Sequence, residues 1–370
     1  MTVDKISLRQ LNRATLARQM LLERETASVS EAVKRLFGMQ AQEPRPPFVG
    51  LWTRLTSFNI DALRAALRDR NIVRATMMRG TLHLVTTRDY LEFRSVLQPM
   101  LTQGMRVLGE RAEGLELEQL IPVARDLLHD CPRTFDELRM LLRDVFPHVN
   151  DRAMGYAVRL HIPLVMVPTA DRWAYPAVAA FTPAETWIGQ PLSRDISTEM
   201  LIHRYLSAFG PATASDAQTW SGLTGLTSTL RSMRSQLREF RDDRGRELFD
   251  VVDGARPDAD VPAPVRFLPE FDNLLLAHAD RTRVIADEHR GMVVTKNLRV
   301  HATFLVDGFV AGIWRIERKK ASATMRMTPF TPLTDQVKNA LSSEGERLLR
   351  FVEADASQFD IHFEASTLVG

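Results

Sequence analysis

The feature of this sequence that most constrains its fold is an alternation, repeated three times, between helical and strand periodicity. In each repeat, apolar residues at helical spacing are followed by a short stretch in which apolar and polar residues alternate. Helices followed by a two-stranded hairpin are typical of a winged helix-turn-helix. The pattern therefore predicts an α+β fold, mainly α, built from tandem winged helix-turn-helix units.

The first repeat carries the clearest start and stop signals. Ser28-Val-Ser-Glu31 predicts a capping box, because the Ser28 hydroxyl can accept first-turn amides while Glu31 reaches back. Pro44 disfavours α geometry at the residue before it, so this helix is expected to end near Gln42. Residues 72–85 alternate and predict the wing. The other helices expected in this repeat are 7–25, 48–55 and 60–67.

The remaining repeats and the C-terminal region are predicted in the same way. A linker rich in Pro and Asp, residues 253–264, separates them, and a β-rich, barrel-like domain is expected after it. The domain boundaries predicted from these patterns are 1–112, 113–192, 193–253 and 265–370. The expected helices are 117–128, 134–142, 151–160, 200–209, 213–220, 226–237 and 333–353. The expected strands are 164–168, 172–175, 248–252, 291–296, 300–306, 309–317 and 359–363.

Composition narrows the classes of function. The sequence has one cysteine, Cys131, and no pair of histidines four residues apart, so neither a disulfide nor a metal site is expected, and no cofactor is predicted. No apolar run is long enough to span a membrane, and no export signal opens the chain, so we expect a cytoplasmic protein.

The distribution of charge along the chain is uneven. Residues 1–112 hold 18 Lys and Arg against 10 Asp and Glu, although the whole chain has a net charge of only +2. This basic N-terminal third suits a phosphate-facing surface, and solvated arginines are the alternative.

The stretch GMQAQEPRPP, residues 38–47, contains the candidate catalytic residues. Gln40 and Gln42 lie two apart, and on a continuing helix their side chains would point about 200° apart. At a helix end that unwinds ahead of the prolines, the two amides could converge and hold one water molecule. Such a pair suits a reaction whose leaving group is already activated, such as loss of a positively charged N7-alkylated purine. A solvated helix end is the alternative that spacing alone leaves open.

Three motifs carry a resemblance to a known family. Gly38-Met-Gln-Ala-Gln42, Met78-Arg-Gly-Thr-Leu-His-Leu-Val85 and Leu268-Pro-Glu-Phe-Asp272 together resemble the winged-helix DNA glycosylases of the AlkZ and YcaQ type. The likeness extends over essentially the whole chain, including Val306-Asp-Gly308 and Gly312-Ile-Trp-Arg315. The resemblance implies a monofunctional glycosylase that excises N7-alkylated purines without a metal, and in some members unhooks interstrand crosslinks.

The resemblance also assigns roles to particular residues. It makes Gln40 and Gln42 the water-placing pair of a Gln-x-Gln branch associated with self-resistance in producers of alkylating natural products. It implies double-stranded, alkylated DNA as the partner, and we expect a location at the nucleoid. We also expect a monomer, because a curved tandem array can embrace DNA by itself. A non-catalytic winged-helix regulator is the alternative function. The expected DNA contacts are Arg45, Arg79, His83, His289 and Arg290. His289 and Arg290 are expected at the tip of a C-terminal hairpin. For His83, a buried and hydrogen-bonded side chain is an equal alternative to a DNA contact.

Overall fold

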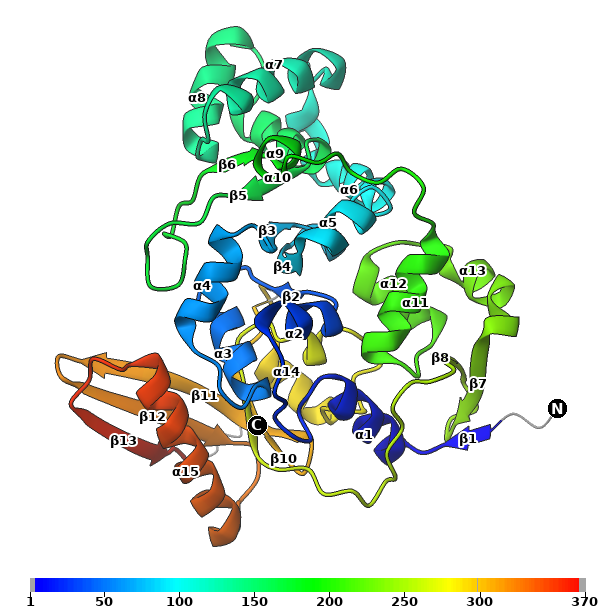
Figure 1. Cartoon of the computed structure of the whole chain (residues 1–370), viewed down its shortest axis with the longest axis vertical. Helices are drawn as coiled ribbons and strands as arrows, with labels where there is room; N and C mark the ends of the chain where they lie inside the picture. The colour runs from blue at the N-terminus through cyan, green and yellow to red at the C-terminus, as the bar shows by residue number, and fades with distance from the viewer. Residues whose placement is uncertain (1–3, 298, 366–370) are drawn as a thin grey trace.

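The structure, a computed structural model, describes residues 4–297 and 299–365, which form a mixed α/β fold with three sheets. Figure 1 shows α7 and α8 at one end of the long axis and the C-terminal sheet at the other end. The small strands β2, β3 and β4 lie between these ends, flanked by α11 and α12. No helix in the described part of the chain is long and apolar enough to cross a membrane.

The first helices begin where the sequence signals place them. Ser28 and Glu31 form the predicted capping box at the start of α2. That helix ends earlier than expected, at Arg35, because Phe37 and Gly38 both take positive φ angles, 51° and 88°, which a right-handed helix cannot accommodate. The helices of this part are α1 (Leu8–Arg18), α2 (Val29–Arg35), α3 (Pro46–Arg54) and α4 (Ile60–Arg68).

A five-stranded antiparallel sheet of order β2-β4-β3-β5-β6 joins the first two repeats. The hairpin predicted for residues 72–85 is confirmed as β3 and β4. The second predicted hairpin is wrong, because β5 pairs with β6 and not with residues 172–175. There the chain turns back tightly, with Ala174 at a φ of 65°. The strands are β2 (Met39–Gln40), β3 (Ile72–Thr76), β4 (Leu82–Thr86), β5 (Leu164–Met166) and β6 (Phe181–Pro183).

Short helices follow β4 and surround β5 and β6. The capping box predicted at Thr134 and Glu137 is present at the start of α8. These helices are α5 (Thr87–Phe93), α6 (Gln98–Gly104), the 3-10 segment η2 (Met105–Ala112), α7 (Leu117–Asp130), α8 (Phe135–Val145), α9 (Asp151–His161) and α10 (Ala184–Ile188).

The third repeat forms helices followed by a hairpin, of which only the second strand was predicted; the helix expected over residues 226–237 ends at Ser232, and β7 begins at Leu237. The N-terminal strand β1 (Asp4–Ile6) pairs in parallel with β7, so the two ends of the first 253 residues share one sheet. The elements are α11 (Thr198–Phe209), α12 (Ala214–Ser221), α13 (Leu226–Ser232), η3 (Arg234–Gln236), β7 (Leu237–Asp242) and β8 (Glu247–Val251).

The C-terminal sheet has the order β13-β12-β11-β10-β9 and, among the described residues, does not close into the expected barrel. Strand β12 was not predicted, and residues 290–293 are helical where a strand was expected. Gly308 closes the β10–β11 turn after Asp307, as the Asp-Gly signal predicts. The elements are β9 (Arg266–Leu268), η4 (Asn273–Leu275), η5 (Asp287–His289), α14 (Arg290–Val293), β10 (Thr303–Val306), β11 (Phe309–Lys319), β12 (Ser322–Pro329), α15 (Asp335–Val352) and β13 (Gln358–Phe363).

Candidate active site

The two glutamines lie on and just beyond a short strand rather than at a helix end. Gln40 closes β2 and pairs with His83 of β4, and the N–H of Ala41 continues the pairing by donating to the Leu82 carbonyl oxygen at 2.7 Å. The strand ends at Gln40, and Gln42 lies in a bend just beyond it. Gln40 is 8% exposed and Gln42 is exposed, so one amide is held in the protein and the other faces solvent.

Arg79 holds the side chain of Gln40. Its Nη2 donates to Gln40 Oε1 at 2.7 Å, and its Nη1 donates to the carbonyl oxygen of Trp220 at 2.6 Å. Burial and, to a lesser extent, the nearby Arg281 lower the pKa of Arg79 to about 10, so the guanidinium remains charged at neutral pH. Arg79 lies in the turn between β3 and β4. Because Trp220 is near the end of α12, Arg79 connects the end of that helix to Gln40.

His83 is fully buried beside Arg79 and is neutral. Its Nδ1 lies 3.0 Å from the Thr81 carbonyl oxygen, which can only accept, so Nδ1 carries the proton. Its Nε2 then accepts from Arg79 Nη2 at 3.4 Å. Burial, with the charge of Arg79 as the second cause, lowers the pKa of His83 to about 3. This is the buried, hydrogen-bonded alternative that the sequence left open, and His83 and Gln40 both contact Arg79 Nη2.

Two further side chains fix the main chain of the Gln-Ala-Gln segment. Asn273 Nδ2 donates to the carbonyl oxygen of Gly38 at 3.0 Å. Arg74 of β3 donates from Nε to the Ala41 carbonyl oxygen at 2.9 Å and from Nη2 to that of Gln42 at 3.0 Å. Sequence analysis missed both residues; the one signal for Arg74 is an arginine within the otherwise uncharged strand Ile-Val-Arg-Ala-Thr.

A cavity of about 10 Å³ lies next to Gln40, which is room for about one water molecule. Gln19 and Asn273 both line it, and in the described structure Gln19 Oε1 and Asn273 Oδ1 are buried without a hydrogen-bond partner. The amide nitrogens of both residues donate to main-chain carbonyl oxygens, so these two oxygens are the free acceptors. The cavity therefore has the polar lining that a bound water needs.

A buried ion pair between Arg54 and Asp272 also lines this cavity. Arg54 of α3 and Asp272 make two parallel hydrogen bonds of 2.9 Å, and both side chains are almost fully buried. Asp272 belongs to the Leu-Pro-Glu-Phe-Asp motif and also accepts from the N–H of Leu274. The motif thus connects the C-terminal region to α3 directly beside Gln40.

The other predicted DNA contacts lie outside the β3–β4 turn that holds Gln40. Arg45 immediately precedes α3 and is half-buried. His289 and Arg290 occupy the junction of η5 and α14 and not a hairpin tip, so that placement was wrong. The turns of the C-terminal hairpins are at Asp307–Gly308 and Lys320–Ala321. Among the described residues, no group of three His, Cys, Asp or Glu side chains is arranged to hold a metal ion.

Comparison with known proteins identifies the family. Residues 33–351 match the family described as DNA glycosylase AlkZ-like. The chain belongs to this AlkZ-like DNA glycosylase family, and it is a DNA glycosylase. A relative from Streptomyces sahachiroi, an interstrand DNA cross-link repair glycosylase, is 25% identical over 366 residues, which is 94% of this chain and 96% of the relative. The solved structure of the Streptomyces sahachiroi DNA glycosylase AlkZ matches the fold with a TM-score of 0.79 at 23% identity, over 97% of this chain and 100% of that one.

Proposed function

We propose that this AlkZ-like glycosylase hydrolyses the N-glycosidic bond of N7-alkylated purines in duplex DNA, with Gln40 and Gln42 placing the attacking water. The observation that carries the proposal is the orientation of the Gln40 amide by Arg79, next to a cavity with room for about one water. An amide held in this way keeps its N–H groups and one lone pair of Oε1 for a water molecule.

The chemistry of the substrate suits neutral amides. Alkylation at N7 gives the purine a positive charge, so the departing base leaves neutral and the charge moves to the sugar. Water must then be positioned and the cationic sugar stabilised, and fixed dipoles can do both without a strong base. His83 is buried and neutral with its Nε2 bonded to Arg79, so it is not the general base in this proposal.

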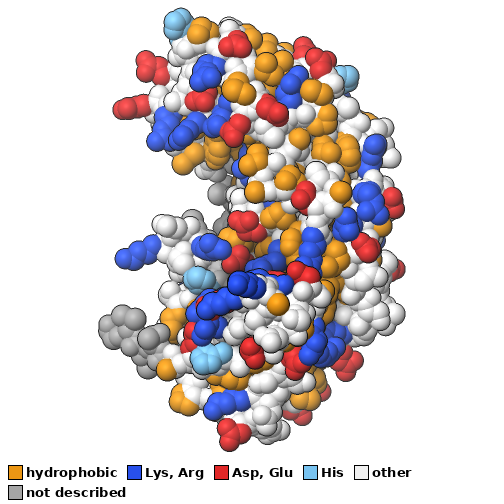
Figure 2. Space-filling model, turned by 90° about the vertical axis from the view of Figure 1, so that its left-hand side faces the viewer, with side chains coloured by type: hydrophobic (Ala, Val, Ile, Leu, Met, Phe, Trp, Pro, Cys, Tyr) orange, Lys and Arg blue, Asp and Glu red, His pale blue; other side chains and the backbone are white. Residues whose placement is uncertain are grey.

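We infer that the helix–hairpin segments act as tandem winged helices and that one copy of the chain binds the duplex. Figure 2 shows Lys and Arg side chains gathered across the middle of one face, beside a notch in its outline, which suits a phosphate backbone. The name of the Streptomyces sahachiroi relative makes interstrand crosslinks a second substrate to test. The Gln-Ala-Gln motif, which resembles the Gln-x-Gln branch, makes self-resistance a role to test beside general repair.

The test of the substrate class is a single-turnover excision assay on matched duplexes. One duplex carries N7-methylguanine at a single position, a second carries a bulkier N7 adduct, and a third carries guanine. We expect alkali-cleavable abasic product from the alkylated duplexes and none from guanine. Tight, sequence-selective binding to one unmodified duplex with no excision from any adduct would instead support a non-catalytic regulator.

A further inference from the structure

Arg74 is a buried cation whose hydrogen bonds go to the Gln-Ala-Gln main chain. Arg74 is 3% exposed and is a member of no ion pair among the described residues, although the charge of Glu43 acts on it from beyond ion-pair distance. Its Nη1 is buried without a hydrogen-bond partner there. Burial lowers the pKa of Arg74 to about 10, so it stays charged at neutral pH at a cost in desolvation.

The two carbonyl oxygens that Arg74 contacts belong to consecutive peptide groups, one on each side of the Gln42 Cα. These peptide groups join Ala41 to Gln42 and Gln42 to Glu43, so holding both of them restricts φ and ψ of Gln42. A carboxylate partner would compete for the same N–H donors. The Arg74 guanidinium also lies over the ring of Tyr175, 4.8 Å from its centroid. Tyr175 belongs to the segment between β5 and β6, so this segment helps to hold Arg74 in place.

From this geometry we propose that Arg74 is a positioning residue for Gln42. Gln42 lies beyond the end of β2 and its side chain is exposed, so strand pairing does not fix it. The two hydrogen bonds from Arg74 restrain the main chain of Gln42. In a similar way, the hydrogen bond from Arg79 restrains the side chain of Gln40. The inference rests on the proposed catalytic role of Gln42.

The test compares Arg74 with a matched buried arginine, Arg94, whose hydrogen bonds go to residues outside the Gln-Ala-Gln segment. Arg94 is 1% exposed, and it donates to Gln98 Oε1 at 2.9 Å and to the Leu160 carbonyl oxygen at 3.1 Å. Arg74→Met, Arg74→Lys and Arg94→Met would be assayed for single-turnover excision of N7-methylguanine at saturating enzyme, for affinity to undamaged duplex, and for melting temperature.

We expect Arg74→Met and Arg74→Lys to lose about 10–100-fold in excision rate, because a small displacement of a positioning group has an effect of that size. Their affinity for undamaged duplex should stay at the wild-type value. Arg94→Met should lower the melting temperature comparably and keep its excision rate. Including the lysine variant covers the case in which Arg74→Met does not fold.

A double-mutant cycle with Gln42→Ala separates this inference from the proposed function. If Arg74 acts through Gln42, the double variant should be no slower than Gln42→Ala alone. Wild-type excision by both Arg74 variants, or an equal loss in Arg94→Met, would overturn the inference. Wild-type excision by Gln42→Ala would overturn the catalytic role of Gln42 itself.

Discussion

Arg79 takes a backbone conformation that residues with side chains rarely adopt, with a φ of 57°. Such a conformation costs of order 1 kcal/mol, and here it places the guanidinium on the amide of Gln40. The sequence drew attention to Arg79, His83 and the glutamines, but it could not show that three of these four side chains contact one another. Those contacts depend on the register between β2 and β4, which is set by packing.

Replacing Arg79 distinguishes a role in positioning from a role in DNA binding. Asn tolerates a left-handed backbone, so Arg79→Asn should fold with little loss of stability. We expect the single-turnover excision rate to fall about 10–100-fold with DNA affinity unchanged, because the Gln40 amide loses its partner. A variant with weakened DNA affinity and a normal rate at saturation would mean that Arg79 contacts DNA, as first predicted from the sequence.

His83 makes stability depend on pH in a defined direction. Its pKa falls from 6.5 to about 3 on folding, so between these values the unfolded chain binds more protons and the free energy of unfolding rises with pH. At pH 5 the native state should be less stable than at pH 7 by about 2 kcal/mol on account of His83. Urea titrations at both pH values should show a smaller difference for His83→Gln, and an equal difference would contradict this account.

At the scale of elements, local signals were predictable and tertiary pairings were not. The capping boxes at Ser28 and Thr134, the β3–β4 hairpin and the Asp-Gly turn are short-range patterns, and all are present. The two-residue strand β2 has no periodicity of its own and exists because β4 lies beside it. In the same way β5 pairs with β6 across an intervening segment, which no local signal specifies.

The ion pair between α3 and the 269–275 segment should be important for the folded site. Asp272→Asn leaves the charge of Arg54 buried without its partner, and loss of one member of a buried pair costs about 3–5 kcal/mol. We expect a drop of that size in the free energy of unfolding, measured by urea denaturation. As a control, Asp61→Asn in the exposed pair with Arg64 should change it by less than about 1 kcal/mol.

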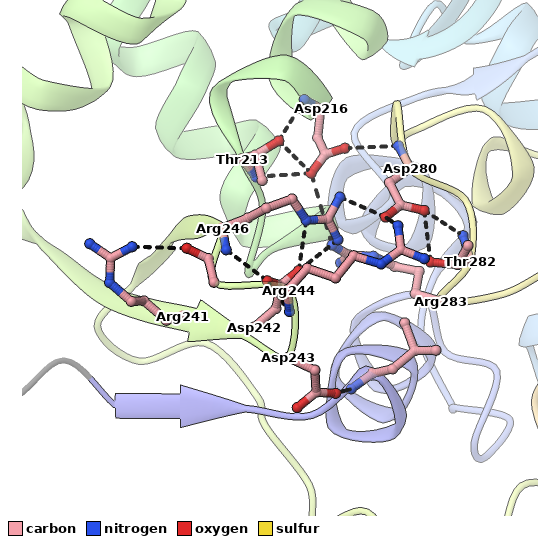
Figure 3. A network of polar contacts seen from close by, with 12 residues as sticks. Thr213, Asp216, Arg241, Asp242, Asp243, Arg244, Arg246, Asp280, Thr282 and Arg283 are labelled. Atoms are coloured by element: carbon pink, nitrogen blue, oxygen red, sulfur yellow. Dashed lines mark hydrogen bonds and ion pairs between the residues drawn. The ribbon is translucent and has the colours of Figure 1, made fainter.

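At the scale of the whole molecule, ion pairs join segments that are far apart in the sequence. Arg18 of α1 pairs with Asp250 of β8, and Asp307 of the β10–β11 turn pairs with Arg13 of the same helix. Figure 3 shows a further network in which Arg246 joins Asp242 to Asp280, while Asp216 accepts from the main chain next to Asp280. The four predicted domains thus share sheets and ion pairs, and their boundaries stay a prediction.

The central claim is that Gln40 and Gln42 carry the chemistry of this glycosylase, and one measurement tests it most directly. It is single-turnover excision of N7-methylguanine from duplex DNA by the wild type and by the Gln40→Ala/Gln42→Ala variant, with DNA affinity measured for both. The account predicts abasic product from the wild type, at least about 100-fold slower product formation by the variant, and equal affinity. Excision at the wild-type rate by the double variant would contradict it.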